Sequence, residues 1–239
     1  MNAADVLADA DLRVEWANQH IQHFEKEIQL FHARESYRVI RNVDPQHPNL
    51  VKITDPPRIP PQLNLIASDA VHNMRVALDY FACSLAVLNG KSMSSVYFPF
   101  AADAGAYGER QTQEKINKLS PDAKCFIDGL KPYKGGNNFL WAVHEINKTD
   151  KHRNLLDLDQ AAPMAYFTPR QGENACHPVT GAQLYDYEIK LVPGLANLEG
   201  FEGQSALTLV KEFLANVATV LKDGRALFFP GTESIYVFG

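Results

Sequence analysis

The stretch "DAVHNMRVALDYF", from Asp69 to Phe81, decides the fold because its apolar residues repeat at the period of an α-helix. The repeat continues in both directions at spacings of three and four, which places the apolar side chains on one stripe. That stripe consists of Leu63, Ala67, Ala70, Met74, Ala77, Phe81 and Leu85. The pattern predicts a helix from Gln62 to Leu88, which the dipeptide Asn89-Gly90 ends.

The same helix carries more polar residues than a core segment needs. His72, Arg75 and Asp79 are spaced so that their side chains stack on successive turns. Apolar residues flank them on both sides, so we expect these polar groups to be only partly exposed. Because an unpaired buried charge costs several kcal/mol, they require a polar partner from another part of the chain.

A second stretch, "HEINKTDKHRNLLDL" (144–158), offers that partner. His144, Asn147 and Lys151 repeat the spacing of the first motif on a helix predicted for residues 137–156, which Asn137 caps. We therefore expect the two helices to lie side by side. In the expected pairs, Asp79 or Asp69 lies within hydrogen-bond reach of Lys151, His152 or Arg153, and Arg75 meets Asp150 or Glu145.

Two further helices complete a predicted bundle, over residues 9–34 and 205–222, and Gly224 is expected to end the second. Shorter helices are predicted at 110–119 and after Ser120. Strands are predicted at both ends of the segment 36–57 and in "MAYFTP", "LYDYEIKLV" and "SIYVFG", while "VYFPF" is a strand or an extended segment. The expected fold class is α+β, predominantly α: a helical bundle with a small antiparallel β-sheet, in a single domain of residues 1–239.

The amino-acid composition of the chain argues against several classes of function and location. The 239-residue chain has a net charge of -5, which argues against a broad coating of DNA or of an anionic membrane. Its three cysteines, Cys83, Cys125 and Cys176, have no paired spacing, which is typical of a reducing compartment. We find neither the pattern of a secretory signal nor an apolar run long enough for a membrane span, so we expect a cytoplasmic protein.

Two motifs resemble a family of uncharacterised bacterial proteins. That family has a helix of the form D-x-x-H-N-x-R-x-A-L-D and, further on, N-x-x-D-K-H-R. The matching residues here are Asp69, His72, Asn73, Arg75, Ala77, Leu78 and Asp79, followed by Asn147, Asp150, Lys151, His152 and Arg153. The segments "YFPF" and "LKPYKGGNN" also resemble those between the family's motifs, so the resemblance covers about residues 62–156. It implies no particular activity.

The helical layout with a polar centre is also similar to the HEPN bundles, many of which cleave RNA. Those proteins carry an arginine followed after four to six residues by a histidine, and neither Arg75 nor Arg153 has such a histidine. Arg13 and His20 do have this spacing, but they lie on the first predicted helix, and we interpret that as coincidence.

Two functions fit the polar residues. The first is a non-enzymatic binding or regulatory module, a homodimer through a bundle face, with binding candidates Asn73, Asn147, Asp150 and Lys151. The second is a metal-independent HEPN-like RNase of a defence or toxin–antitoxin system, with catalytic candidates His72, Arg75, Asp79, His152 and Arg153. Histidines beside carboxylates and an arginine suit acid–base chemistry on a phosphodiester. Clusters of charged residues and histidines are more often structural than catalytic, so the binding or regulatory module is the preferred hypothesis. Its expected partner is a second copy of the chain, RNA or another protein.

We expect neither a metal nor a cofactor. "HEINKTDKH" departs from H-E-x-x-H because its histidines are eight residues apart, which disfavours a metal set of His144, Glu145, His152 and Asp79. "KPYKGGNNF" places Lys131 and Lys134 near a helix N-terminus, where an anion can bind. A tight turn leading into the helix is the preferred interpretation of that segment.

Overall fold

The computed structural model describes residues 2–34, 38–41, 51–54, 58–152, 158–169, 171–172, 175–176, 180, 182, 185–195 and 198–233. The chain forms two compact units. The first comprises Met1–Lys26, Pro61–Asp157 and Leu207–Gly239, and the second comprises Glu27–Pro60 and Leu158–Ala206. The single domain expected from the sequence remains a prediction.

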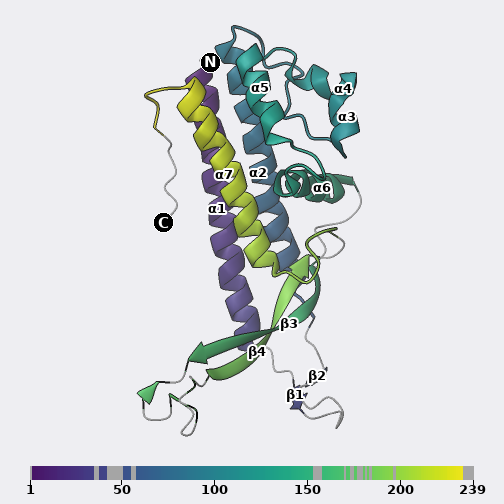
Figure 1. Ribbon diagram of the computed structural model, residues 1–239, viewed down its shortest axis with the longest axis vertical. Helices are drawn as coiled ribbons and strands as arrows, with labels where there is room; N and C mark the ends of the chain where they lie inside the picture. The colour runs from purple at the N-terminus through teal and green to yellow at the C-terminus, as the bar shows by residue number, and fades with distance from the viewer. Residues whose placement is uncertain are drawn as a thin grey trace. The chain divides into compact units, whose positions relative to one another are not determined.

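Three long helices run alongside one another in the first unit: α1 (Ala3–Arg34) up to Lys26, α2 (Pro61–Leu88), and α7 (Ala206–Phe228) from Leu207 onwards (Figure 1). A fourth helix, α6 (Asn138–His152), packs against α2 and crosses it. The apolar stripe of α2 faces inward, and Phe24, Phe81 and Phe213 are fully buried, whereas Leu12 and Trp16 of α1 are exposed. The prediction of a predominantly α fold is confirmed, and no helix among the described residues is both long and apolar enough to cross a membrane.

Helix α1 begins six residues earlier than the apolar pattern predicted. Asn2 and Asp5 close its first turn reciprocally: the Asp5 N–H donates to Asn2 Oδ1 (2.9 Å), and the Asn2 N–H donates to Asp5 Oδ2 (3.0 Å). Such a capping box satisfies amide donors that have no partner within the helix. The buried face of α1 also reaches these first turns, since Val6 and Leu7 are buried, so capping and apolar burial together account for the early beginning of α1.

The predicted end of the last helix at Gly224 was wrong, because α7 continues to Phe228. A β-carbon placed at Gly224 would lie 2.7 Å from Phe81 Cε2 and closer still to Cζ. Gly224 therefore lets α7 approach the Phe81 ring of α2, and its role is close packing within the helix rather than termination.

Short helices fill the chain between α2 and α6: α3 (Ala104–Gly108), α4 (Arg110–Gln113), the 3-10 turn η1 (Glu114–Ile116) and α5 (Pro121–Leu130). The helix predicted at 110–119 is thus a short α-helix followed by a 3-10 turn. Helix α3 escaped prediction, although Asp103 caps it by accepting a hydrogen bond from the Ala106 N–H (2.9 Å). Helix α5 begins as expected, with Ser120 as N-cap and Pro121 in the first turn.

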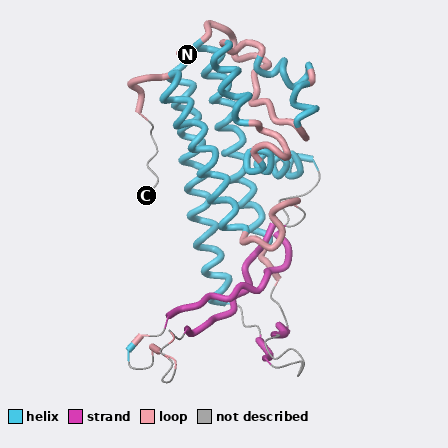
Figure 2. Tube along the Cα trace, in the orientation of Figure 1, coloured by secondary structure: helices cyan, strands magenta, loops and turns pink. Residues whose placement is uncertain are grey.

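Strands belong to the second unit and pair two by two (Figure 2). Strand β1 (Arg38–Arg41) is antiparallel to β2 (Val51–Thr54), and β3 (Leu158–Pro169) is antiparallel to β4 (Tyr185–Leu195). "MAYFTP" and "LYDYEIKLV" lie largely in β3 and β4. Of the two alternatives predicted for "VYFPF", a strand or an extended segment, the structure shows the extended segment. "SIYVFG" lies outside the described residues.

Candidate functional site

The polar residues of α2 meet α6 at two points one helical turn apart. His72 Nδ1 lies 2.9 Å from Asn147 Oδ1, and Arg75 Nε donates to His144 Nδ1 (3.4 Å). These contacts confirm that the two motif helices pack against each other through their polar stripes. Asn147 is buried, while the two histidines are partly exposed.

Arg75 is held by its own helix as well as by α6. Its Nη1 lies 2.5 Å from Asp79 Oδ1, one turn further along α2, but the geometry is not that of a hydrogen bond, so the attraction is mainly electrostatic. Its guanidinium carbon lies 4.5 Å from the centre of the Phe100 ring, a cation–π contact. Only 11% of the Arg75 side chain remains exposed.

The "YFPF" segment (97–100) supplies the remaining partners of the cluster. The Phe98 N–H donates to Asp79 Oδ1 (2.8 Å), and the Phe100 ring stacks on His144 with centroids 4.8 Å apart and planes 3° from parallel. Asp79 therefore anchors the extended backbone of this segment. We define the polar network as His72, Arg75, Asp79, Phe100, His144 and Asn147.

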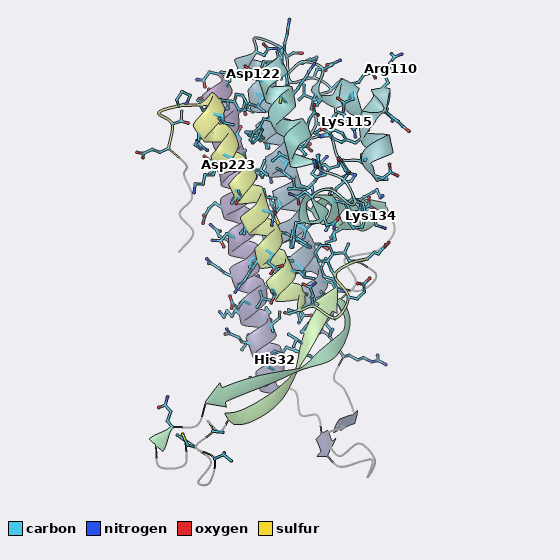
Figure 3. All side chains as sticks on the ribbon, viewed as in Figure 1. His32, Arg110, Lys115, Asp122, Lys134 and Asp223 are labelled. Atoms are coloured by element: carbon cyan, nitrogen blue, oxygen red, sulfur yellow. The ribbon has the colours of Figure 1, made fainter. Side chains whose placement is uncertain are left out.

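Lys115 of η1, marked among the short helices in Figure 3, is a second cation beside this network. Its Nζ donates to the Phe100 carbonyl (3.2 Å). Burial, and then the nearby Arg75 cation, lower the pKa of Lys115 from its ordinary value, while Asp79 acts in the opposite direction. Lys115 was not among the predicted site residues, because nothing in this polar stretch of sequence marks one lysine as partly buried.

Asn73 belongs to a different contact, between α2 and α1. Arg13 Nη1 donates to Asn73 Oδ1 (2.9 Å), and Asn73 Nδ2 donates to the Asp69 carbonyl (2.8 Å). The buried Asn73 amide thus uses both its donor and its acceptor inside the protein. The side chain of Asp69, also a candidate partner in the sequence analysis, is exposed.

The sequence-predicted site residues therefore fall into three groups. His72, Arg75, Asp79 and Asn147 come together in the network, and Asn73 lies apart at the α1 contact. The side chains of Asp150, Lys151 and His152, and all of Arg153, lie outside the described residues, so their pairing remains a prediction. Among the described side chains of α6, Arg75 contacts His144, and Glu145 pairs with Lys148 (2.7 Å). The expected pairing of Arg75 with Asp150 lies outside the described residues.

Two other features that the sequence singled out have structural roles here. Asn137 caps α6 by accepting from the Leu140 N–H (3.0 Å), and Lys134 Nζ lies 5.6 Å from the centre of the Trp141 ring. Both contacts agree with a tight turn leading into a helix. Within the described part of the chain, no three His, Cys, Asp or Glu side chains are grouped so that they could hold a metal ion.

A groove of about 550 Å³ borders the network where Asp79 is 27% exposed. Val76, Tyr80 and Cys83 of α2 line it together with residues 93–97. Burial, and then the Asp79 carboxylate, raise the pKa of Cys83 to about 11. Since a thiol must ionise to react as a nucleophile, Cys83 is held in its unreactive form at neutral pH.

This environment predicts the order in which the cysteines react. Iodoacetamide at pH 8 is expected to label the exposed Cys125 at least about tenfold faster than Cys83, because Cys83 is half-buried and its raised pKa keeps the thiol protonated. Peptide mass spectrometry of a time course distinguishes the two sites. Equal rates would mean that Cys83 is neither shielded nor held neutral.

The same raised pKa gives an expected loss of stability in alkali. The folded state resists ionisation of Cys83 up to about pH 11, whereas the unfolded thiol ionises from its ordinary value of 9.0. The unfolded state is therefore favoured as pH rises through this interval. Cys83→Ala should flatten that part of a curve of unfolding free energy against pH, and an unchanged slope would contradict the assignment.

Comparisons with known proteins give no match: no protein family, no curated protein and no solved structure matches the chain.

Proposed function

We propose that this protein is a non-enzymatic binding or regulatory module whose polar network is structural. The observation that supports this most directly is the position of Arg75. Its guanidinium contacts a carboxylate, an imidazole and an aromatic ring while only 11% of the side chain is exposed. A group that stabilises charge on a bound phosphodiester needs open donors directed at the substrate, whereas Arg75 directs Nε at His144 and holds Nη1 beside Asp79.

The two histidines support the same proposal. His72 contacts Asn147, and His144 accepts from Arg75 while stacking on Phe100. A general acid or base needs a ring nitrogen within reach of the substrate proton. The described contacts instead join α2, α6 and the "YFPF" segment, which is what a structural network does. The HEPN-like RNase remains the alternative, because the side chain of the catalytic candidate His152 lies outside the described residues.

The test compares two arginines that each pair with an acidic residue four positions further along the chain. Arg75→Ala is expected to lower the free energy of unfolding by about 2–3 kcal/mol, because Asp79 loses its buried counter-charge. Arg110, which is 91% exposed and lies 2.6 Å from Glu114, is the matched control. Arg110→Ala should change stability by less than about 0.5 kcal/mol. Urea titrations followed by circular dichroism measure both.

An RNA-cleavage assay on the same preparations addresses the catalytic alternative. The wild type is expected to cleave no RNA in metal-free buffer. Cleavage by the wild type that Arg75→Ala and His152→Ala abolish, with unfolding curves unchanged, would overturn the proposal in favour of the nuclease.

A further inference from the structure

One stripe of α1 stays exposed along almost six turns of the helix. Its positions alternate at spacings of four and three, the repeat by which helices pair in a coiled coil. The stripe consists of Asp5, Asp9, Leu12, Trp16, Gln19, His23 and Lys26, and each of these residues is exposed or partly exposed. All of them lie in the part of α1 that belongs to the first unit. We call this surface the α1 stripe.

The centre of the α1 stripe is apolar. Leu12 is 55% exposed and Trp16 is 52% exposed, and they lie one turn apart on the same face. The Trp16 ring stands edge-on to His20 with centroids 5.5 Å apart, which orients its face. A neighbouring Leu and Trp exposed in mid-helix are unusual for a surface that faces only water, and tryptophan is the residue most enriched at the energetic centre of interfaces.

The charges of the α1 stripe are ordered along the helix. Asp5 and Asp9 lie on the N-terminal side of Trp16, and His23 and Lys26 lie on its C-terminal side. If two copies of α1 pair antiparallel about Trp16, the two aspartates of each stripe meet the part of the other stripe that carries Lys26. Parallel pairing would place like charges together. The stripe is therefore self-complementary in one orientation only, and that orientation has the two-fold symmetry of an isologous dimer.

We propose that the α1 stripe is a homodimer interface, in which two copies of this chain pair antiparallel with Trp16 at the two-fold axis. Asp5 of each copy then faces Lys26 of the other, and the seam is roughly 30 Å long at 1.5 Å per residue. The inference deepens the proposed function, since it names a second copy as the partner of the module. The polar network of α2 and α6 takes no part in it.

Sedimentation equilibrium of the full chain tests the dimer. The wild type is expected to reach twice its 26.7 kDa mass in the micromolar range. Trp16→Glu should weaken the dimer at least about 100-fold, because it puts two carboxylates at the axis. Leu227→Glu is the control of matched chemistry: Leu227 is 63% exposed on α7, outside the stripe, and its replacement should leave the dissociation constant unchanged. Circular dichroism melts verify that each variant is folded.

A charge exchange tests the antiparallel orientation. Lys26→Glu should weaken the dimer roughly tenfold by facing the two aspartates of the other copy, and adding Asp9→Lys should recover most of that loss. Raising the salt concentration should reduce both effects. A wild type that stays monomeric up to about 100 µM, or a dimer indifferent to Trp16→Glu, would overturn the proposal. Such a result would leave the RNA-cleavage and Arg75 experiments unaffected, so the two proposals fail separately.

Discussion

Replacing Asp11 by alanine is expected to lower the free energy of unfolding by about 3–5 kcal/mol, as the loss of one partner from a buried ion pair does. Only 1% of the Asp11 side chain is exposed, and Arg225 Nη2 donates to both of its carboxylate oxygens at 2.5 and 2.6 Å. The pair joins α1 to α7 in the first unit. Without Asp11, the Arg225 guanidinium stays buried with its counter-charge removed.

Two controls isolate the ion pair from other effects of the substitution. The double variant Asp11→Leu with Arg225→Met should be far closer to the wild type than Asp11→Ala, because an apolar pair of similar volume leaves no charge unpaired. Glu25 and Lys211 form a second pair between the same two helices, at 2.8 Å, but both are well exposed. Lys211→Ala should therefore cost less than about 1 kcal/mol. Urea titrations that give Asp11→Ala and Lys211→Ala equal costs would contradict the argument.

The long helices could be predicted from periodicity, because the buried apolar residues of α2 and α7 recur at spacings of three and four. The buried face of α1 was predicted less well, because its apolar residues include the exposed Leu12 and Trp16. The stripe of α2 and its polar neighbours predicted both the helix and its contact with α6. The two partners of Asp79, Arg75 and the Phe98 N–H, were not predicted. Arg75 lies one turn away on the same helix, whereas the partners predicted for Asp79 were residues of the second motif. The Phe98 N–H that Asp79 also binds is a backbone group, which no side-chain pattern reveals.

Contacts between distant segments were the least predictable. Asp11 and Arg225 are 214 residues apart, and a charged residue on an amphipathic helix resembles one that faces solvent until the neighbouring helix is placed. The role of Gly224 was equally hard to predict from the sequence. In a sequence, a glycine near the end of an apolar stripe is typical of a helix end, and only the position of the Phe81 ring shows that it serves packing.

That packing gives the second large effect. Phe81 is fully buried and meets Phe126 edge-on, with centroids 6.1 Å apart, as well as Gly224. Phe81→Ala should lower the free energy of unfolding by about 3–5 kcal/mol, because it removes a buried ring and leaves a cavity between α2 and α7. Gly224→Ala should itself cost about 1–3 kcal/mol, because the new β-carbon overlaps the ring, although alanine is the better helix former.

The decisive measurement is whether Gly224→Ala lowers or raises the free energy of unfolding, first in the wild type and then in the Phe81→Ala variant. With Phe81 present, the overlap outweighs the gain in helix propensity and the change destabilises. In the Phe81→Ala background the ring is gone, so the same change should stabilise by up to about 1 kcal/mol and fill part of the cavity. Gly129 in α5 is the control, because a β-carbon there would have no neighbour within 4 Å. Gly129→Ala should therefore show only the stabilising effect of higher helix propensity. If Gly224→Ala destabilises equally with and without the ring, the glycine is required for a reason other than the approach of Phe81.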